Sequence, residues 1–346
     1  MGKPIRVLVV DDSAFMRRVL SDMLEEDPQI EVVATCVDGS EALRKVKALR
    51  PDVVTMDIKM PHMDGFTALG LIMEQCPTPV LMVTGLGKED ADIVLRAFEF
   101  GAVDFVLKPS GTVSLDMAKV KAELIEKVKI AAGIDLRSLP QARAELPTIP
   151  PVDARGFRVI AMGASTGGPQ AIMAILREIP QGLPLAILIV QHMPPNFTRS
   201  FAERLSKACG LQAREAGEGD LVEPGVVLVA PGDWHMEVRP VSENSPLLKV
   251  HLHQEPRVHG VRPSIDVLLA SIANHARDRG VGVILTGMGR DGAAGMAKLQ
   301  SSSGTTIVQD EATCTVFGMP KAALETITPD RVLPLNEIAR TLTGLA

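Results

Sequence analysis

Five side chains in the first third of the chain could handle phosphate and a metal ion. They are three carboxylates, a hydroxyl and an ammonium: Asp11, Asp12, Asp57, Thr84 and Lys108. Each stands at or just past the end of an apolar, β-rich run. Three carboxylates at one place repel one another unless a cation joins them, and oxygen ligands suit Mg²⁺. A carboxylate beside Mg²⁺ can accept a phosphoryl group, which the hydroxyl and the ammonium could then bind.

Each of these five residues also has an ordinary alternative role, because Asp and Thr are common in turns and as helix caps. For any one residue that alternative is the better interpretation. All five at strand ends, with Lys108 followed by Pro109, favour a phosphoryl-accepting site.

A second group of residues could perform acyl transfer. The sequence GASTG (163–167) fits the G-x-S-x-G pattern, which exposes a serine, here Ser165, on a tight strand-to-helix turn. His192 ends the next apolar run, and Asp291 lies in the glycine-rich stretch GMGRDGAAG (287–295). In a triad of these types the histidine takes the serine proton and the aspartate holds the imidazole. Backbone amides near Thr166 or Met288 could stabilise an oxyanion.

Each member of this second group is ambiguous by itself. Glycine-rich turns also bind phosphates through backbone amides, but the turn at 163–169 carries neither of the two phosphate-loop patterns. A lone histidine at a strand end is more often structural. The chain order Ser, His, Asp differs from the order in α/β-hydrolases, which excludes that fold.

The elements that would position the first group alternate regularly along residues 1–133. Apolar runs predict strands, and helical spacing follows each of them. The strands are expected at 5–10, 31–36, 52–57, 79–85 and 104–109, and the helices at 14–26, 40–50, after 63, at 91–100 and at 115–132. In the first helix one apolar stripe should contain Phe15, Val19, Leu20, Met23 and Leu24. Five strands that alternate with five helices predict an α/β, flavodoxin-like, doubly wound parallel sheet.

The alternation restarts after a proline-bearing stretch. Residues 134–156 hold prolines at 140, 147, 150 and 151 and show no sustained period, which predicts a linker. Strands are then expected at 157–163, 185–193, 226–232 and 281–289, with an antiparallel hairpin between the last two. The second domain, 157–346, is therefore predicted to be α/β with a mostly parallel sheet.

Composition narrows the class of protein. The net charge of −6 disfavours nucleic-acid binding, which usually depends on a basic face. The N-terminus lacks the pattern of a signal peptide, and no apolar stretch approaches the roughly 18–20 residues that cross a bilayer, so a cytoplasmic protein with no membrane insertion is expected. Four scattered cysteines without a CxxC pair predict reduced thiols rather than disulfides or a zinc site.

A few other polar residues could serve a site. His251 and His253 alternate on one predicted strand, but no third metal ligand is evident. His235, His259 and His275 are expected at the surface or in packing. Arginines 257, 262 and 290 could steer an acidic partner, although a solvated face is the simpler interpretation.

Residues 4–130 resemble the response-regulator receiver family, through DD at 11–12, MDIKMPHMDG at 56–65, Thr84 and Lys108-Pro109. The resemblance implies that Asp57 is the phosphoacceptor, that Asp11, Asp12 and Asp57 hold Mg²⁺, and that a histidine kinase is the phosphodonor. It also implies that Thr84 and Lys108 bind the phosphoryl group and that Phe105 occupies the aromatic switch position. The chain departs from the family at Lys59, where relatives often carry Glu or Asn.

Residues 157–345 resemble the chemotaxis protein-glutamate methylesterases. The shared motifs are GASTGGP, VQHM, PGDWHM (231–236), RPSIDVLLAS (262–271) and LTGMGRDGAAGM (285–296). The resemblance implies a catalytic triad of Ser165, His192 and Asp291, with oxyanion amides at Met288 and Thr166 and no cofactor at the hydrolase site. It implies a monomeric enzyme, controlled by phosphorylation, that demethylates glutamate methyl esters on chemoreceptors, releases methanol and deamidates certain glutamines.

Two alternatives remain at this point. The first is a receiver-controlled esterase that acts on another protein or small ester outside chemotaxis. The second is a nucleotide-binding or nucleic-acid-binding transcriptional regulator, which the acidic balance and the lack of a basic recognition helix oppose.

Overall fold

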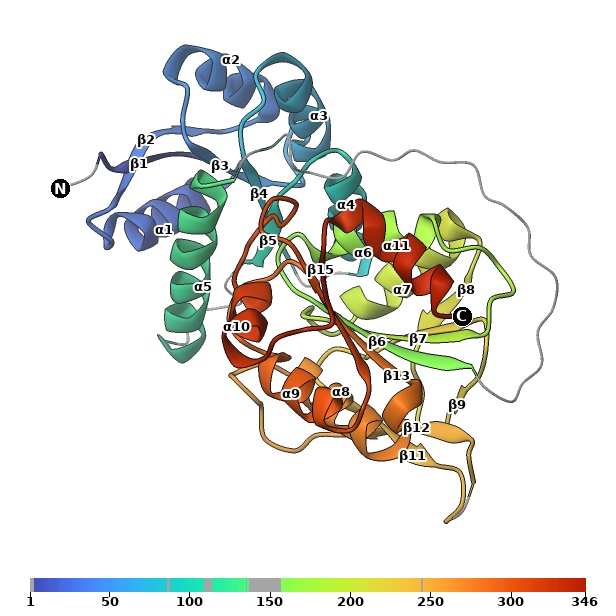
Figure 1. The fold of residues 1–346 in the computed structure, drawn as a ribbon. Coiled ribbons are helices and arrows are strands. Elements are labelled where there is room, and N and C mark those ends of the chain that lie inside the picture. Colours follow the sequence, from blue (N-terminus) through green and yellow to red (C-terminus); the bar gives the residue numbers. More distant parts are fainter. Residues whose placement is uncertain (1–2, 86–87, 109–113, 135, 137–156, 244) are drawn as a thin grey trace. The chain divides into compact units, whose positions relative to one another are not determined.

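The structure is a computed structural model that describes residues 3–85, 88–108, 114–134, 136, 157–243 and 245–346. The chain divides into two compact units, residues 1–137 and 138–346, and the division falls within the stretch predicted as a linker (Figure 1). Pro109 lies outside the described residues. So do residues 137–156, which belong to the predicted linker.

The first unit is built on a five-stranded parallel sheet with the order β2-β1-β3-β4-β5. The strands are β1 (Ile5–Val10), β2 (Ile30–Cys36), β3 (Val53–Asp57), β4 (Val80–Thr84) and β5 (Asp104–Leu107). The central strands are buried on both faces, as expected for continuous runs of Val, Leu and Met. The predicted flavodoxin-like sheet is therefore confirmed.

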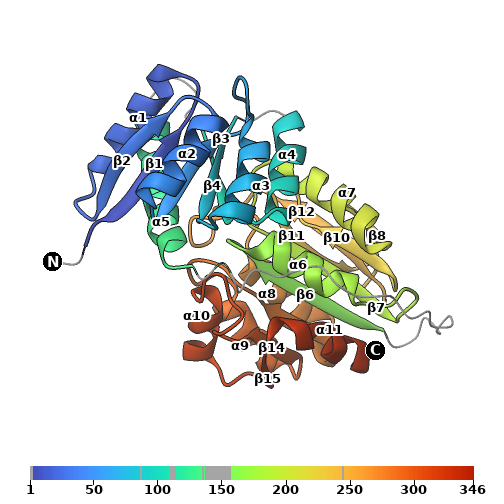
Figure 2. The same cartoon turned by 90° about the horizontal axis from the view of Figure 1, so that it is seen from above.

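Five helices cover the sheet of the first unit on both faces (Figures 1 and 2). They are α1 (Ala14–Glu25), α2 (Gly39–Leu49), α3 (Gly65–Gln75), α4 (Lys88–Glu99) and α5 (Ser114–Ala132). Helix α1 packs with α5, whereas α3 contacts both α2 and α4. Ser13, Asp38 and Asp64 cap the first three helices, because each side chain accepts a backbone N–H from the first turn.

The predicted apolar stripe of α1 is wrong at its first residue. The side chain of Phe15 is 69% exposed, while Leu20, Met23 and Leu24 are buried. Met16 packs against the core in place of Phe15. Helical spacing gives the period of the apolar residues but cannot tell which of two neighbouring positions faces the core.

The second unit contains a seven-stranded parallel sheet with the order β15-β14-β13-β6-β7-β10-β8. Its strands are β6 (Arg158–Ala164), β7 (Leu185–Gln191), β8 (Gln212–Glu215), β10 (Val226–Val229), β13 (Gly280–Ile284), β14 (Thr305–Gln309) and β15 (Arg331–Leu333). Strands β11 (His235–Pro240) and β12 (Leu248–His253) pair antiparallel, and β12 also pairs with β9 (Leu221–Val222). This confirms the predicted parallel sheet with an antiparallel hairpin.

Four strands of the second unit were not predicted: β8, β9, β14 and β15. Each has only two to five residues, and β8 and β15 mix polar and apolar side chains at the two edges of the sheet. Such short strands carry little periodicity, because only tertiary pairing makes them extended.

Helices flank this second sheet as well. Helix α6 (Gly168–Arg177) contacts α7 (Phe197–Cys209) and α11 (Leu335–Gly344), while α9 (Ala293–Ser301) contacts α8 (Ile265–His275) and α10 (Met319–Thr326) (Figure 1). A single 3₁₀ turn, η2 (Arg277–Arg279), leads from α8 into β13. The main core of this unit gathers side chains from the sheet, from α8 and from the β11–β12 hairpin.

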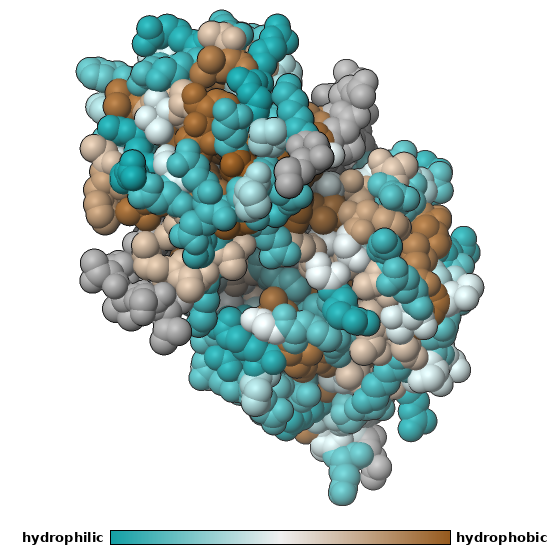
Figure 3. Space-filling model, turned by 90° about the vertical axis from the view of Figure 1, so that its left-hand side faces the viewer, coloured by the Kyte–Doolittle hydropathy of each residue, from teal (hydrophilic) through white to brown (hydrophobic). Residues whose placement is uncertain are grey.

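All four cysteines are free thiols, as predicted. Among the described residues, no helix combines the length and apolar character that a membrane crossing requires. On the face drawn in Figure 3, apolar groups of atoms alternate with polar ones.

Gly65 offers a test of the first unit's packing. A Cβ at this position would lie 1.9 Å from the carbonyl oxygen of Asp57, whereas a Cβ at Gly70 in the same helix would meet only Phe100 at 3.9 Å. Gly65→Ala should therefore lower the free energy of unfolding by about 3 kcal/mol or more, because a backbone atom must move. Gly70→Ala should leave it unchanged or raise it by about 0.5–1 kcal/mol. Calorimetry of the full chain measures both, and equal effects of the two variants would refute this account.

Candidate functional site

The order of strands in the second unit reverses beside β6. The chain runs from β6 to β7 and on toward β10 and β8 on one side, and then crosses to β13 on the other side of β6. In open parallel sheets, ligands bind outside the carboxyl ends of the strands at such a reversal. The three predicted residues follow the three strands at this point: Ser165 after β6, His192 after β7 and Asp291 in the loop after β13.

Strand register makes Ser165 and His192 neighbours. Gly163 pairs with Val190 and Ala164 with Gln191, so the next residue along each strand is one of the two. The backbone N–H of His192 donates to the carbonyl of Ala164 at 3.1 Å, which continues the parallel ladder by one step. Parallel neighbours in register lie about 5 Å apart, which is close enough for their side chains to meet.

The turn that carries Ser165 is held tightly. Its N–H donates to the carbonyl of Thr286 at 3.1 Å, and its carbonyl accepts from the Gly168 N–H and from the Gln191 side-chain amide, both at 2.8 Å. Gly287 packs directly on this turn: a Cβ there would lie 2.8 Å from the Cβ of Ser165. Glycine is therefore required at 287 for the loop after β13 to approach the serine.

His192 and Asp291 form a hydrogen-bonded pair. His192 Nε2 lies 2.9 Å from Asp291 Oδ2, and the two side chains are 12% and 3% exposed. With Nε2 facing the carboxylate, Nδ1 is the ring nitrogen left to accept a proton. In the described part of the chain Ser165 Oγ and His192 share no hydrogen bond, and such bonds often tighten only when substrate binds.

Asp291 is embedded in donors at the start of α8. Its Oδ1 accepts from the Ser264 hydroxyl at 2.7 Å and from the Asp266 N–H at 3.1 Å, and its Oδ2 accepts from the Ile265 N–H at 2.7 Å. Burial raises the pKa of this carboxyl, but the bonds from His192, Ser264 and Ile265 outweigh burial, so the pKa lies below its ordinary value. Asp291 is thus held as a carboxylate.

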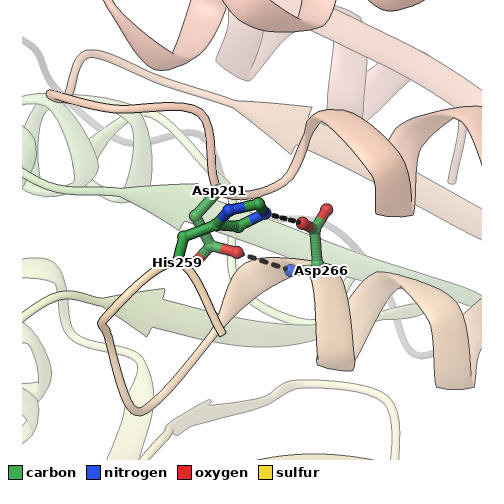
Figure 4. Close-up of side chains that lie close together, drawn as sticks. All are labelled: His259, Asp266 and Asp291. Carbon is green, nitrogen blue, oxygen red and sulfur yellow. Dashed lines mark hydrogen bonds and ion pairs between the residues drawn. The ribbon is translucent and has the colours of Figure 1, made fainter. Parts of the chain in front are cut away.

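A second carboxyl lies beside Asp291. Figure 4 shows His259 bonded to the Asp266 side chain, at 3.0 Å, and the Asp291 carboxylate bonded to the Asp266 N–H. Ligand atoms of the three residues lie within 4.8 Å of one another. Their carboxylate oxygens accept hydrogen bonds, including one from the Gly295 N–H to Asp266 Oδ1 at 2.6 Å. Burial and the neighbouring Asp291 raise the pKa of Asp266.

The two predicted oxyanion residues belong to two segments of the chain that meet near Ser165. Met288 follows Gly287, whose backbone contacts Ser165, and within the described residues its N–H donates no hydrogen bond. Thr166 follows Ser165 directly and is 4% exposed, and its carbonyl accepts from the Thr286 hydroxyl at 3.0 Å. The oxyanion role of these two amides stays a prediction.

Sequence reasoning gave no supporting role to the buried polar residues at this edge: Gln191, His235, Ser264, Thr286 and Gln309. Gln309, at the end of β14, accepts from the Thr286 N–H at 2.8 Å and donates to the carbonyl of Thr313 at 2.8 Å. A usable signal was present at Gln191, which ends an otherwise apolar strand, whereas Gln309 ends β14, a strand that was not predicted. Polar residues at such places need partners in the interior.

Several polar residues outside the triad are placed more precisely than the sequence could place them. Arg262 is not part of a solvated face: its side chain is 15% exposed and bonds to Asp233 at 2.9 Å. His235 is fully buried, and His259 pairs with Asp266. His251 and His253 do stack on one side of their strand, with ring centroids 5.8 Å apart.

In the first unit, the predicted acidic residues gather at the carboxyl edge of the sheet. Oxygens of Asp11, Asp12 and Asp57 lie within 4.8 Å of one another. Lys108 Nζ bridges two of them, at 2.8 Å from Asp11 and 2.7 Å from Asp57. A set of three carboxylates at this spacing fits an Mg²⁺ ion.

Thr84 and Phe105 lie on β4 and β5, the two strands that follow β3 in the sheet. Thr84 is 1% exposed, and its hydroxyl has no hydrogen-bond partner among the described residues. Phe105 is buried, with its ring edge-on to Phe98 at 6.3 Å and the ammonium of Lys127 5.2 Å from its centroid.

The Asp57 carboxylate is less well stabilised in the folded protein than in water. Burial raises its pKa and Asp11 adds to the rise, against the bonds from Lys108 and the Ile58 N–H, and the net direction is upward. The folded state therefore disfavours the charge on this side chain.

The fold and the residues at these two sheet edges define a two-unit α/β protein of the receiver–hydrolase class. The chain belongs to the CheB methylesterase family, whose sequence model matches residues 160–342, more than half of the chain. Residues 7–118 match the response regulator receiver domain. Both resemblances predicted from the motifs are confirmed.

Full-length relatives and a solved structure agree with this family. A protein-glutamate methylesterase/protein-glutamine glutaminase of Pyrococcus horikoshii is 47% identical, over 99% of this chain and 94% of that relative. One of Symbiobacterium thermophilum is 47% identical over 99% and 97%. The crystal structure of the Thermotoga maritima CheB methylesterase catalytic domain is 39% identical with a TM-score of 0.53, covering 55% of this chain and 99% of that domain.

The raised pKa of Asp57 predicts a pH-dependent stability change. Because its folded pKa lies above the unfolded value of 3.8, ionised Asp57 costs stability at neutral pH, and that cost disappears as pH falls below 3.8. Asp57→Asn should raise the unfolding temperature of its unit at pH 7 by a few degrees, since about 1 kcal/mol corresponds to roughly 2–8 °C in units of this size.

The gain from Asp57→Asn should shrink as the pH is lowered through the folded pKa. Asp22→Asn is the control, because Asp22 is 52% exposed and bonds to Arg18 in the same helix, so little change is expected. Calorimetry of the full chain at pH 7 and near pH 4 makes the comparison. A destabilised Asp57→Asn variant at pH 7 would contradict the claim that the folded state disfavours this charge.

Proposed function

We propose that this chain hydrolyses methyl esters of glutamate side chains on chemoreceptor proteins, and that phosphorylation of its receiver controls the activity. The observation that carries the proposal is the His192–Asp291 pair at the strand reversal, where strand register brings His192 beside Ser165. The names of the full-length relatives support the substrate class. The cytoplasmic ends of receptors and a chemotaxis histidine kinase would be the partners in the cytoplasm.

In the proposed acylation, Ser165 Oγ attacks the ester carbonyl of a methylated glutamate. His192 Nδ1 takes the serine proton, and Asp291 stabilises the resulting imidazolium through Nε2. Negative charge develops on the carbonyl oxygen, where the Met288 and Thr166 N–H groups would donate to it. The imidazolium then gives its proton to the departing methoxide, which leaves as methanol, and a glutamyl ester of Ser165 remains.

Deacylation uses the same groups in reverse. His192 removes a proton from water, the hydroxide attacks the glutamyl ester, and the proton returns to Ser165 Oγ as glutamate leaves. The same path deamidates glutamine if the first leaving group is ammonia. The relatives' second name, protein-glutamine glutaminase, supports this second reaction for the chain.

In the receiver, Asp57 would accept the phosphoryl group, with Asp11 and Asp12 as further ligands of Mg²⁺. The ion supplies charge that offsets both the carboxylates and the incoming phosphate. Lys108 already contacts Asp57, and the Thr84 hydroxyl has no hydrogen-bond partner in the described part of the chain, so both could bind phosphoryl oxygens. Phe105, in the middle of β5, would respond to the change at Thr84 as the aromatic switch residue.

The nucleophile is tested by Ser165→Ala. The variant should lose methanol release from methyl-labelled receptor membranes by a factor of about 10⁴ or more, since losing the nucleophile removes the covalent route. Ser301→Ala is the control, because Ser301 is an exposed serine whose hydroxyl donates to the carbonyl of Lys298 in its own helix. Assays with small esters run beside the receptor membranes separate a receptor enzyme from an esterase with another substrate. Methanol release that persists in Ser165→Ala would refute the mechanism.

Control by the receiver is tested by Asp57→Asn. A small phosphodonor with Mg²⁺ should stimulate methanol release by the wild-type chain and leave the Asp57→Asn variant at its basal rate, because no acyl phosphate can form. The Asp22→Asn control should be stimulated as the wild type is. Equal stimulation of Asp57→Asn and wild type would show that Asp57 is not the phosphoacceptor.

A further inference from the structure

Ser264 occupies the N-cap position of α8 but does not cap that helix. An N-cap serine normally accepts an N–H from the first turn of its own helix. Here the first N–H groups, of Ile265 and Asp266, donate to the Asp291 carboxylate instead. The Ser264 side chain makes no cap bond, and its hydroxyl donates to Asp291 Oδ1 at 2.7 Å. Asp291 thus caps the helix from another loop, and the Ser264 hydroxyl is bonded to Asp291.

The four donors to Asp291 divide between its two oxygens. Oδ2 accepts from His192 Nε2 and from the Ile265 N–H, while Oδ1 accepts from Ser264 Oγ and from the Asp266 N–H. A carboxylate turns easily about its Cβ–Cγ bond, since that torsion is broad and roughly two-fold. Among the described residues, the Ser264 hydroxyl is the one side-chain donor on the oxygen that His192 does not use. Together with the Ile265 and Asp266 N–H groups it holds the plane of the carboxylate and the direction in which Oδ2 faces the imidazole.

Ser264 is itself fixed by a buried histidine. Its backbone N–H donates to His235 Nδ1 at 3.2 Å, and His235 Nε2 lies 3.2 Å from the carbonyl of Pro256. Nδ1 must accept and Nε2 must donate, so these two bonds define one neutral tautomer of a fully buried ring. Burial and the neighbouring His253 and Arg262 lower the pKa of His235, against the Pro256 carbonyl and Asp291, which agrees with a neutral ring.

We propose that Ser264 is a positioning residue for the hydrolase site, holding the Asp291 carboxylate toward His192 and held in turn by His235. This role deepens the proposed function and rests on it. It also explains why a fully buried serine and a fully buried histidine stand side by side near the strand reversal, where apolar residues would cost less to bury.

Ser264→Ala tests this role against a merely structural one. Losing a hydrogen bond to a charged group should lower kcat for ester hydrolysis about tenfold or more, with KM changed less than about twofold. The acid limb of the pH profile of kcat/KM should shift, because the protonation of the His192 imidazole depends on how the Asp291 carboxylate faces it. Among the described residues, the ionisable groups around Asp291 are His192, His235, His259 and Asp266, and this substitution leaves all four in place.

The matched control is Ser271→Ala in the same helix. Ser271 is buried, accepts from the Val238 N–H at 3.0 Å and donates to the Leu268 carbonyl at 2.7 Å, and neither of these partners contacts Asp291. It should lose comparable stability in calorimetry yet keep the wild-type kcat and pH profile. Ser264→Thr keeps the hydroxyl and should recover most of the lost kcat. The substrates are methyl-labelled receptor membranes and p-nitrophenyl acetate, whose turnover does not depend on receptor binding.

If Ser264→Ala fails to fold, two substitutions of His235 test the same positioning role. His235→Asn keeps an acceptor near the position of Nδ1, whereas His235→Leu removes it. We expect the Leu variant to lose kcat and shift the acid limb, and the Asn variant to keep more of both. If Ser264→Ala, or the His235 pair in its place, matches Ser271→Ala in kcat and pH profile, the positioning role is overturned. Wild-type turnover, measured alongside, tests the proposed function separately.

Discussion

Parallel strand pairing is the constraint on which both units depend. In a parallel sheet every strand points the same way, so residues that follow different strands arrive at one edge although they lie far apart in the chain. This brings Asp11, Asp57 and Lys108 within ion-pair distance, and it brings His192 to Asp291 across 99 residues. Helices on both faces shield the sheets from water. The polar groups at the carboxyl edges of the strands are then the groups that can contact a ligand.

The buried carboxylates at the two sheet edges have pKa values shifted in opposite directions. Asp291 is surrounded by four donors, its pKa is lowered, and its charge is stabilised in the folded state. Asp57 has fewer donors and a neighbouring Asp11, and its pKa is raised. A carboxylate that orients an imidazole must keep one charge state and one direction. In the role proposed for Asp57, a carboxylate with few donors has less stabilisation to lose when it takes up a phosphoryl group.

At some positions, local sequence patterns do not predict which contacts a side chain makes. Ser264 has the residue type, the position and the backbone angles of a helix cap, yet its hydroxyl is turned to Asp291. Phe15 has the spacing of a core residue, yet it is exposed, and Met16 packs against the core instead. In both cases a partner distant in sequence decides the outcome, and helical periodicity contains no information about that partner.

The sequence by itself determined the class of both sheets, the alternation of strands and helices, and the residue types at the strand ends. Apolar runs of Val, Ile and Leu and the intervening helical spacing are local properties, so they can be predicted without knowing any contact. The glycine-rich stretch that begins at Gly287 and the G-x-S-x-G turn could also be recognised from the sequence as motifs.

Only the tertiary structure decided which atoms of those residues meet. It decided that β13 crosses to the far side of β6, that His192 presents Nε2 to Asp291, and that Ser264 and His235 stand behind that carboxylate. It also decided the short edge strands β8 and β15. These outcomes depend on register, on crossovers and on hydrogen bonds between residues far apart in the chain, and such long-range pairings are settled by the packing of the whole unit rather than by any segment of it.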